Sequence, residues 1–427
     1  MGGKRIIQYC LFNTEITALS LATTLSSQSK FDLASNAAAH RHMRLHRLSL
    51  TDFRNYAALT WRPTARISVL FGPNGSGKTN LLEAVSLLVP GRGLRGARNA
   101  DLPRHGGSGR WAVAGRFATA DGDVDIGTGS APEGPLDRRV FRLDGAAPRS
   151  QAEIASRLAA VWLTPQMDRL FQEGASGRRR FLDRLVWALE PGHAREVAAH
   201  DAAMAQRNRL LAERRADPGW LAGLEDAMAR HAVAATAARI ALVARMNAVA
   251  PFAGFPRAHM GLDCAIAERL GTAPALVVED WLRVSLAAAR ARDAAAGSAA
   301  IGAHRTDMAL ADAVTGTRAA LASTGEQKAL LVGVILRHAA LIADARGSAP
   351  MLLLDEPAVH LDPERRAALF AALLQLPAQT LITGTDAETF LPLAGRAEGL
   401  RVHGGKLVSD GRFPPIDSAA TPVPDTL

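Results

Sequence analysis

The stretch GPNGSGKTN, residues 72–80, is the most informative part of this 427-residue chain. It follows the apolar run ISVLF and precedes LLEAVSLL, whose apolar residues have helical spacing. The letters match the pattern G-x-x-x-x-G-K-[ST], and a strand before and a helix after are the context that such a phosphate-binding loop requires. We therefore expect the loop to bind a nucleoside triphosphate. The alternative is a glycine-rich turn without a ligand.

The residue types in this loop suit phosphate binding. Glycines let consecutive backbone N–H groups turn inward around an anion, and the start of the following helix adds its positive end. Lys78 is expected to reach the β- and γ-phosphates, and the Thr79 hydroxyl is expected to bind Mg²⁺. The loop residues expected to contact the nucleotide are Gly72, Pro73, Asn74, Gly75, Ser76, Gly77, Lys78, Thr79 and Asn80.

The segment PMLLLDEPAVHLD, residues 350–362, predicts a second part of the same site. Its apolar run fits a fully buried parallel strand, and Asp355 and Glu356 follow at the carboxyl end, where open α/β sheets bind ligands. Two adjacent carboxylates there are unfavourable without a nearby cation. We expect Asp355 to hold Mg²⁺ through water and Glu356 to orient the attacking water as a base. An acidic helix cap is the alternative.

A third motif lies between these two. The residues STGEQ at 323–327 precede an apolar helical pattern. Taken alone they form an S-x-x-E capping box, in which a serine and a glutamate satisfy backbone N–H groups at a helix start. The residues by themselves leave a capping role and a functional role equally open.

The charge balance indicates an anionic partner. The chain holds 50 Lys and Arg against 41 Asp and Glu, which gives a net charge of +9 and a pI near 10.4. This excess suits nucleic acid. Aromatic residues make up only 5%, too few for an extended base-stacking surface, so contacts with DNA should go mainly to phosphates.

The cysteine and hydropathy patterns indicate a cytoplasmic protein. Cys10 and Cys264 are far apart and form neither a disulfide framework nor a metal-binding pattern. We expect no membrane attachment, because no apolar run approaches the length of a membrane span. The longest candidate, residues 329–342, is interrupted by Arg337 and His338.

The chain is longer than the size at which one core usually stops growing, so two or three lobes are expected. Residues 1–42 are rich in Ser, Thr and Ala without sustained periodicity. They predict a disordered extension, or an upstream start codon chosen in place of Met43. The segments expected after them are a head lobe with the phosphate loop at 43–185, a helical arm at 186–298, a second head lobe at 299–410 and a tail at 411–427.

Periodicity predicts the elements around the loop. Alternating apolar residues at 45–53 suggest an edge strand. Residues 90–109 hold many arginines and glycines and predict a mobile basic loop, which either follows a phosphate backbone or is merely solvated. Alternation at 111–126 and 139–143 predicts an antiparallel meander. The apolar spacing at 178–189 predicts a helix.

The arm should be mainly helical. Residues 193–250 are rich in Ala and Arg, and the tripeptide Asp-Pro-Gly at 217–219 divides them into two helices. At 1.5 Å per residue, each helix of this hairpin would be roughly 35 to 45 Å long. A short strand at 260–266 and a helix at 278–295 are expected to follow.

Taken together, the motifs resemble the head domains of ABC-type ATPases. The phosphate loop, STGEQ before a helix, and LLLDEPAVHLD carry this likeness. The runs LSLTDFRNYAALTW, GPNGSGKTNLLEAVSLL, RRRFLDR, QRNRLL and GAHRTD are more narrowly similar to the RecF family of bacterial recombination and gap-repair proteins, over residues 43–405. The fold implied is α/β, an ABC-type P-loop ATPase head of two lobes with an inserted α-helical arm.

The resemblance also implies residue roles. Ser323 and Gly325 would bind the γ-phosphate of an ATP held by a second subunit, which makes Ser323 catalytic together with Lys78 and Glu356. Asp362 would belong to the loop that couples the two sites. The remaining residues implied are Arg54, near the nucleotide, and Gln166, as a metal- or water-sensing glutamine.

One departure from the ABC pattern affects the expected rate. Such heads usually end the strand after the paired carboxylates with a histidine that contacts the γ-phosphate. Here the strand LITGTDAETF offers Thr383, Thr385 and Asp386 instead. Slow hydrolysis is therefore expected, with ATP acting mainly as a dimerisation switch.

The function implied is that of a slow, DNA-dependent ATPase with ATP and Mg²⁺ as cofactors. It would dimerise on ATP at single-strand gaps or duplex junctions and act with RecO and RecR to load RecA, in recombination, repair, replication and the SOS response. A chromosome-maintenance type of DNA clamp is one alternative, disfavoured by the short arm. An ABC transporter motor subunit is another, disfavoured by the basic balance, the STGEQ motif and the helical insertion.

Overall fold

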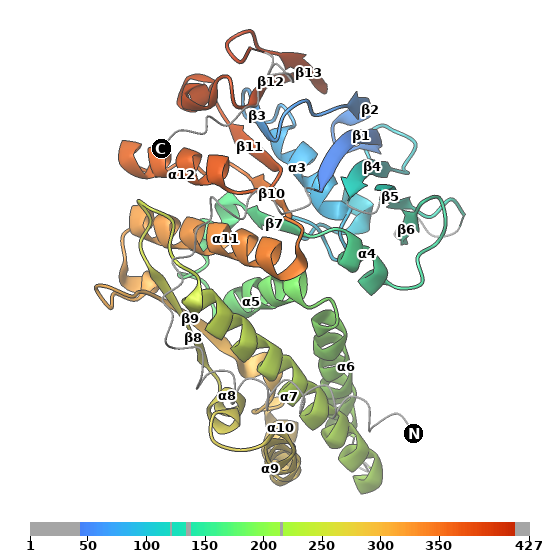
Figure 1. Cartoon of the computed structure of the whole chain (residues 1–427). Helices are drawn as coiled ribbons and strands as arrows, with labels where there is room; N and C mark the ends of the chain where they lie inside the picture. Colours follow the sequence, from blue (N-terminus) through green and yellow to red (C-terminus); the bar gives the residue numbers. More distant parts are fainter. Residues whose placement is uncertain (1–42, 120–121, 134–137, 214–216, 415–427) are drawn as a thin grey trace. The chain divides into compact units, whose positions relative to one another are not determined.

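The computed structural model describes residues 43–119, 122–133, 138–213 and 217–414, all within the unit that spans residues 39–427 (Figure 1). The expectations for residues 1–42, and for residues 415–427 of the tail, lie outside these residues. Phe413, which was expected in the tail, is buried and its ring stacks on that of Phe71 at 6.3 Å.

A six-stranded sheet carries the predicted site motifs. Its order is β13-β12-β3-β11-β10-β7, and every neighbouring pair is parallel except β12 and β13. All residues of the four strands β3, β11, β10 and β7 are buried, as their continuous apolar runs predict. The strands are β3 (Ile67–Phe71), β7 (Ala160–Leu163), β10 (Met351–Leu354), β11 (Thr380–Gly384), β12 (Glu398–His403) and β13 (Lys406–Ser409).

Helices join and flank these strands. Figure 1 shows α3, in light blue, following β3, and α11 and α12, in orange, beside the strands β7 and β10. The head helices are α3 (Lys78–Leu87), α4 (Gln151–Arg157), α5 (Ala175–Leu189), α11 (Thr324–Arg346) and α12 (Pro363–Gln375). Short 3-10 helices are η1 (Asn99–Asp101), η2 (Pro165–Arg169), η3 (Ala303–Arg305), η4 (Ala319–Leu321) and η5 (Glu388–Leu393). The mixture confirms the predicted α/β class.

The second sheet is antiparallel and has the order β2-β1-β4-β5-β6. The predicted meander is confirmed, because β4, β5 and β6 pair in succession. The expectation of an edge strand at 45–53 is wrong: Leu48 on β1 pairs with Trp61 on one side and Gly115 on the other. Apolar alternation reports a half-buried strand and cannot tell an inner strand from an edge strand. The strands are β1 (Arg44–Phe53), β2 (Tyr56–Trp61), β4 (Ala112–Thr119), β5 (Gly122–Ser130) and β6 (Arg139–Leu143).

The basic segment 90–109 is packed and not a free loop. Leu94 and Leu102 are buried, and the Leu94 N–H donates to the Ser86 hydroxyl at 2.7 Å. The Arg104 guanidinium pairs with Asp52 at 2.7 Å. The many glycines and arginines suggested a solvated loop, but Leu94 and Leu102 anchor the segment in the core. The expectation of a mobile loop is therefore not supported.

The arm is more than a helical hairpin. Helices α6 and α7 pack together as predicted, but α8 and α9 share a second apolar cluster with them, and α10 packs against α6 and α9. The predicted helix at 278–295 is two helices that meet at Ala289, and the strand expected at 260–266 ends at Asp263. The arm elements are α6 (His193–Ala212), α7 (Pro218–Ala248), β8 (Ala258–Asp263), α8 (Ala265–Leu270), α9 (Ala275–Ala288), α10 (Arg290–Ala296) and β9 (Asp307–Asp312).

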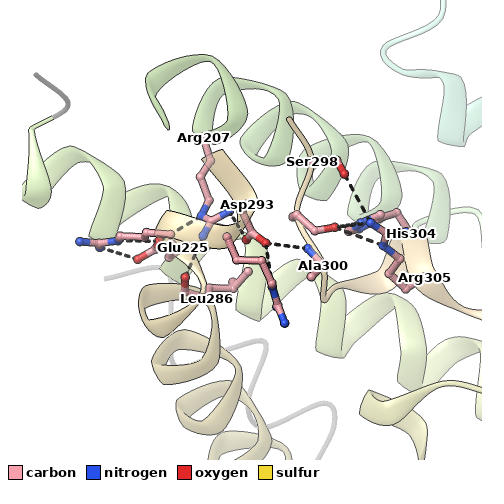
Figure 2. A network of polar contacts seen from close by, with 11 residues as sticks. Arg207, Glu225, Leu286, Asp293, Ser298, Ala300, His304 and Arg305 are labelled. Atoms are coloured by element: carbon pink, nitrogen blue, oxygen red, sulfur yellow. Dashed lines mark hydrogen bonds and ion pairs between the residues drawn. The ribbon is translucent and has the colours of Figure 1, made fainter. Parts of the chain in front are cut away.

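A buried ion-pair network joins these helices (Figure 2). The Arg207 side chain is fully buried and donates to Glu225 Oε1 at 3.0 Å and Asp293 Oδ2 at 2.9 Å. Its third contact is the Leu286 carbonyl oxygen at 2.7 Å. Arg290 completes the network through Glu225 at 2.6 Å. Three helices are therefore held by charges that no local pattern could reveal.

The apolar composition of helix α7 raises the question of a membrane span. Among the described residues it is the one helix long and apolar enough to cross a membrane by length and composition, with 44% of its most apolar window buried. It also carries Glu225 and Arg239, which are buried and ion-paired. The expectation that residues 329–342 were the longest candidate is therefore wrong. Alanine raises the hydropathy of α7 without making it a typical membrane span.

Candidate nucleotide-binding site

The phosphate loop lies between β3 and the start of α3. Gly77 has φ 113°, a conformation that L side chains rarely adopt. A Cβ there would also lie 2.5 Å from Asn55 Nδ2 and 2.7 Å from the Tyr56 hydroxyl. These two residues follow Arg54 and hold the loop through the Ser76 carbonyl at 3.1 Å and the Gly77 carbonyl at 3.1 Å. The β1–β2 turn therefore buttresses the loop.

Lys78 points into its own loop. Its Nζ donates to the Gly72 carbonyl at 2.6 Å and the Pro73 carbonyl at 3.1 Å, and the residue is only 4% exposed. Burial lowers the pKa of the Lys78 ammonium, while the carboxylates of Glu356 and Asp355 act in the opposite direction. No side chain of the described residues pairs with this ammonium, which leaves it available to an anion.

The phosphate loop and the acidic motif at 355–356 meet at Asp355. The Thr79 hydroxyl donates to Asp355 Oδ1 at 2.9 Å, a contact between residues 276 positions apart. Asp355 is 3% exposed, and its N–H donates to the Leu163 carbonyl of the neighbouring strand at 2.9 Å. The parallel register places the carboxyl ends of β3, β10 and β11 at one edge of the sheet.

These residues fit Mg²⁺ and a nucleotide. A hydroxyl and a carboxylate in direct contact are the hard oxygen donors that Mg²⁺ prefers. The buried Ser76 hydroxyl has no hydrogen-bond partner among the described residues, as expected of a group that faces a polar ligand. Thr79 and Asp355 are therefore the residues that would hold the ion.

Glu356 has an unusual backbone. Its φ is 50°, in the left-handed region that non-glycine residues rarely occupy. Its N–H donates to the Thr383 hydroxyl at 2.9 Å, and its half-buried carboxylate makes no hydrogen bond within the described residues. An unengaged carboxylate beside a phosphate loop suits a general base.

Arg54 lies near the loop but is already engaged. Its guanidinium forms a two-bond pair with the buried Glu83 carboxylate at 2.7 and 2.8 Å and donates to the Asp101 carbonyl at 2.7 Å. Arg95 approaches the same carboxylate at 3.4 Å. Glu83 could not be predicted, because a glutamate in a helix gives no signal of its own.

Gln166 lies on η2, just beyond the end of β7. Since Leu163 pairs with Leu354, Gln166 follows the same edge of the sheet as Asp355. Its side chain is exposed and forms no hydrogen bond with Thr79 or Asp355 among the described contacts. The structure therefore brings it to the right edge without joining it to the site.

Ser323 is the N-cap of α11 and forms the predicted capping box with Glu326. Its hydroxyl donates to Glu326 Oε2 at 2.8 Å and accepts the Glu326 N–H at 3.4 Å. The Ser323 N–H also donates to Glu326 Oε2 at 2.8 Å, and this backbone hydrogen bond, together with the one from the hydroxyl, lowers the pKa of the Glu326 carboxyl. In the part of the chain that the structure describes, no hydrogen bond or ion pair joins residues 323–327 to residues 72–80.

Asp362 is also a helix cap. It accepts the Arg365 N–H at 2.7 Å at the start of α12. Its segment lies beside the capping motif of α11, because a Cβ on Gly325 would come within 3.3 Å of the His360 carbonyl oxygen. The expected site residues thus fall into two groups: the loop with Asp355 and Glu356, and Ser323 with Gly325 and Asp362.

Of the three residues that replace the usual histidine, only Thr383 contacts the site. Asp386 accepts the Thr389 N–H at 2.9 Å and the Thr389 hydroxyl at 2.8 Å, and Thr385 donates to Asp386 at 3.1 Å. Both are therefore used within an exposed turn.

Comparisons with known proteins agree with this geometry. The family described as RecF/RecN/SMC N terminal domain matches residues 44–398. Relatives named "DNA replication and repair protein RecF" from Mesorhizobium japonicum and Agrobacterium fabrum are 48% and 47% identical over 366 and 367 residues. Each alignment covers 84% of this chain, and it covers 96% and 97% of the respective relative.

Solved structures show the same fold. Structures described as the recombination mediator protein RecF in the RecFOR pathway, with ATPrS and with ATP, have TM-scores of 0.75 and 0.74. They are 19% and 20% identical to this chain and cover 87% of it, and the chain covers 99% and 100% of theirs. The likeness confirms the predicted fold class.

Proposed function

The chain belongs to the RecF family of DNA replication and repair proteins, and we propose that its phosphate-loop site binds Mg²⁺-ATP as a switch for dimerisation on DNA. The observation that carries this proposal is the contact of Thr79 with Asp355 at 2.9 Å. It joins two short motifs from opposite ends of the chain into one cation-binding pair. The solved relatives described with ATP and ATPrS support the choice of nucleotide.

The residues divide the chemical work. Lys78 moves its ammonium from the Gly72 and Pro73 carbonyls to the phosphates, and Thr79 and Asp355 hold the ion. Glu356 orients water and accepts its proton. Bound Mg²⁺-ATP supplies the phosphoryl group and a counter-charge. Because Thr385 and Asp386 bond within a local turn, neither takes the place of the usual histidine at the γ-phosphate, and hydrolysis is slow.

The second group of residues acts on a partner's nucleotide. Ser323, Gly325 and Asp362 lie near one another, and among the described residues they form no hydrogen bond or ion pair with the loop of their own chain. A symmetric dimer would bring this group to the loop of the other subunit, so that ATP lies between the two chains. The ATP-bound dimer is then favoured by mass action.

DNA is the proposed partner of this dimer. The net charge of +9 and the name of the relatives support it, and the RecFOR pathway in the description of the solved structures supports cooperation with RecO and RecR in loading RecA at gaps or junctions. DNA binding should depend strongly on salt, with log K falling by about 0.9 per phosphate contacted for each unit of log salt on a duplex. A DNA titration at several salt concentrations, with and without ATP, measures this slope. A flat salt response would contradict the phosphate-dominated interface.

A complementation experiment tests the shared site. Lys78→Ala removes the lysine contact of the loop with the phosphates. Ser323→Arg places a bulky side chain where the partner's γ-phosphate must lie. Each variant alone should hydrolyse no ATP. An equal mixture should regain about one quarter of the wild-type rate, since about half of the dimers are mixed and each keeps one sound site.

The controls are the folded state and the assembly state. Lys78 donates only to carbonyls of its own loop, so Lys78→Ala should melt close to the wild type, and Ser323→Arg should lose only the helix cap, about 1 kcal/mol. Light scattering should detect an ATP-dependent dimer of the wild type. A mixture that stays inactive while the wild type remains monomeric in ATP would overturn the proposal.

A further inference from the structure

Thr383 lies between the two halves of the site. It is the fourth residue of β11, the strand that separates β3 from β10, and it is fully buried. It pairs with Leu70 of β3, two residues before the phosphate loop. No role in nucleotide chemistry follows from its residue type alone.

The hydrogen bonds of Thr383 have only one possible direction. Its hydroxyl donates to Asp355 Oδ1 at 2.8 Å, and the Thr383 hydroxyl oxygen accepts the Glu356 N–H at 2.9 Å. A hydroxyl has one proton and two lone pairs, while a carboxylate can only accept and an N–H can only donate. Thr383 therefore connects the metal-side carboxylate with the backbone of the catalytic base.

Each contact constrains a different group. Asp355 Oδ1 receives two hydroxyl protons, from Thr79 and Thr383, so its carboxylate orientation is fixed from both sides. Oδ2 receives no hydrogen bond among the described residues and stays available. At Glu356, the hydrogen bond holds a backbone with φ 50°, a strained conformation that sets where the side chain points.

The simpler alternative is that Thr383 has a purely structural role, as Thr380 does. This residue is on the same strand and is also fully buried, but its hydroxyl donates to the nearby Ala378 carbonyl at 3.3 Å. A buried threonine can thus satisfy itself locally on β11. Thr383 instead uses both of its hydrogen-bonding functions on residues 27 and 28 positions away in sequence.

We propose that Thr383 is a positioning residue for ATP hydrolysis, which orients the Asp355 carboxylate and holds the Glu356 backbone in the conformation that directs the base. This inference rests on the proposed function of the phosphate-loop site. It also assigns a task to the strand position near which ABC heads usually carry a histidine. Here the hydroxyl acts through Asp355 and Glu356 and not on the phosphate itself.

The test compares two threonines on one strand. Thr383→Val removes the hydroxyl at nearly constant shape, and kcat for ATP hydrolysis should fall about 10- to 100-fold, as for other outer-shell contacts. Affinity for Mg²⁺-ATP, measured by calorimetry, should change less, because Lys78 and Thr79 remain. Thr383→Ser should restore kcat. Thr380→Val is the matched control and should hydrolyse ATP at the wild-type rate.

A second readout needs no nucleotide. The Glu356 amide should exchange hydrogen faster in Thr383→Val than in the wild type, as measured by mass spectrometry on the peptide that contains it, and should not change in Thr380→Val. If kcat falls only in proportion to the folded fraction and serine does not rescue it, or if exchange is unchanged, the proposal is wrong. Failure of the proposed function would be seen separately, as wild-type protein that binds no ATP, and the exchange comparison would still decide the role of Thr383.

Discussion

The phosphate-loop site and the arm network treat buried charge in opposite ways. In the site, Lys78 donates only to carbonyls of its own loop, the Ser76 hydroxyl has no partner among the described residues, and the Glu356 carboxylate makes no hydrogen bond within them. In the arm, Arg207 is bonded to two carboxylates and a carbonyl oxygen, and Glu225 is shared with Arg290 (Figure 2).

This difference in hydrogen bonding distinguishes residues that stabilise the fold from residues that bind a ligand. A fully bonded buried network rigidifies the elements that it joins, and removing one member leaves the others unpaired. A site with unused hydrogen-bonding capacity gains partners only when a ligand arrives. Substitutions in the arm should therefore change stability, whereas substitutions in the site should change ligand affinity or rate.

The largest effect is expected in the arm. Arg207→Ala leaves Glu225 and Asp293 buried with too few partners, and it should lower the free energy of unfolding by about 3–5 kcal/mol. Arg230→Ala is the matched control, because its ion pair with Asp226 on α7 is exposed and contributes about 0–1 kcal/mol. Urea unfolding monitored by circular dichroism measures both. Equal losses in the two variants would mean that burial does not distinguish these pairs.

Two buried lysines of the head sharpen the comparison. Lys328, which is 1% exposed, pairs with Asp168 at 2.8 Å, so Lys328→Ala should cost about 2–3 kcal/mol of stability. Lys78 makes no direct ion pair among the described residues, so Lys78→Ala leaves no buried carboxylate without its partner and should cost little stability. It should instead weaken ATP binding at least ~30-fold. Calorimetry and thermal melting of both variants measure the two effects. A Lys78→Ala protein that melts early but binds ATP normally would reverse the interpretation.

These contrasts explain what could be predicted from the sequence. The loop, the acidic strand end and the capping motif are short and contiguous, so their residue types and spacing revealed them. The contact of Thr383 with Asp355 and that of Arg54 with Glu83 join residues from different elements, and no local pattern records them. The arm helices followed from composition, but the network that Arg207 forms did not, because its partners are 18 and 86 positions away.

A buried histidine, His304 of η3, should make the stability depend on pH. Burial lowers the pKa of His304 to about 4, so the folded protein keeps this imidazole neutral while the unfolded chain protonates it near its ordinary value of 6.5. Its contribution is complete above pH 6.5 and is lost as the pH falls toward 4. Protonation linked to His304 alone should decrease the free energy of unfolding by about 1.4 kcal/mol per pH unit in this window.

A histidine pair isolates this effect. His304→Gln should reduce the slope by about 1.4 kcal/mol per pH unit and leave the part due to His338, whose pKa burial lowers to about 3, whereas His259→Gln, which changes an exposed histidine on β8, should keep the wild-type slope. Urea unfolding at several pH values between 4 and 7 measures it. If both variants retain the full slope, protonation of His304 does not drive the acid response.

The smallest effect concerns Ser323, where the two kinds of role overlap. Ser323→Ala removes a helix cap and should cost about 1 kcal/mol of stability, and Ser150→Ala at the start of α4 should cost a similar amount, since Ser150 accepts the Glu153 N–H in the same way. A cap alone predicts that the two variants behave alike. If Ser323 also contacts the nucleotide of a partner, its hydroxyl must exchange Glu326 for a phosphate oxygen, and only Ser323→Ala should weaken the ATP-dependent dimer. Light scattering of both variants with ATP decides between these, because an unchanged dimer in Ser323→Ala would leave this serine as a helix cap and nothing more.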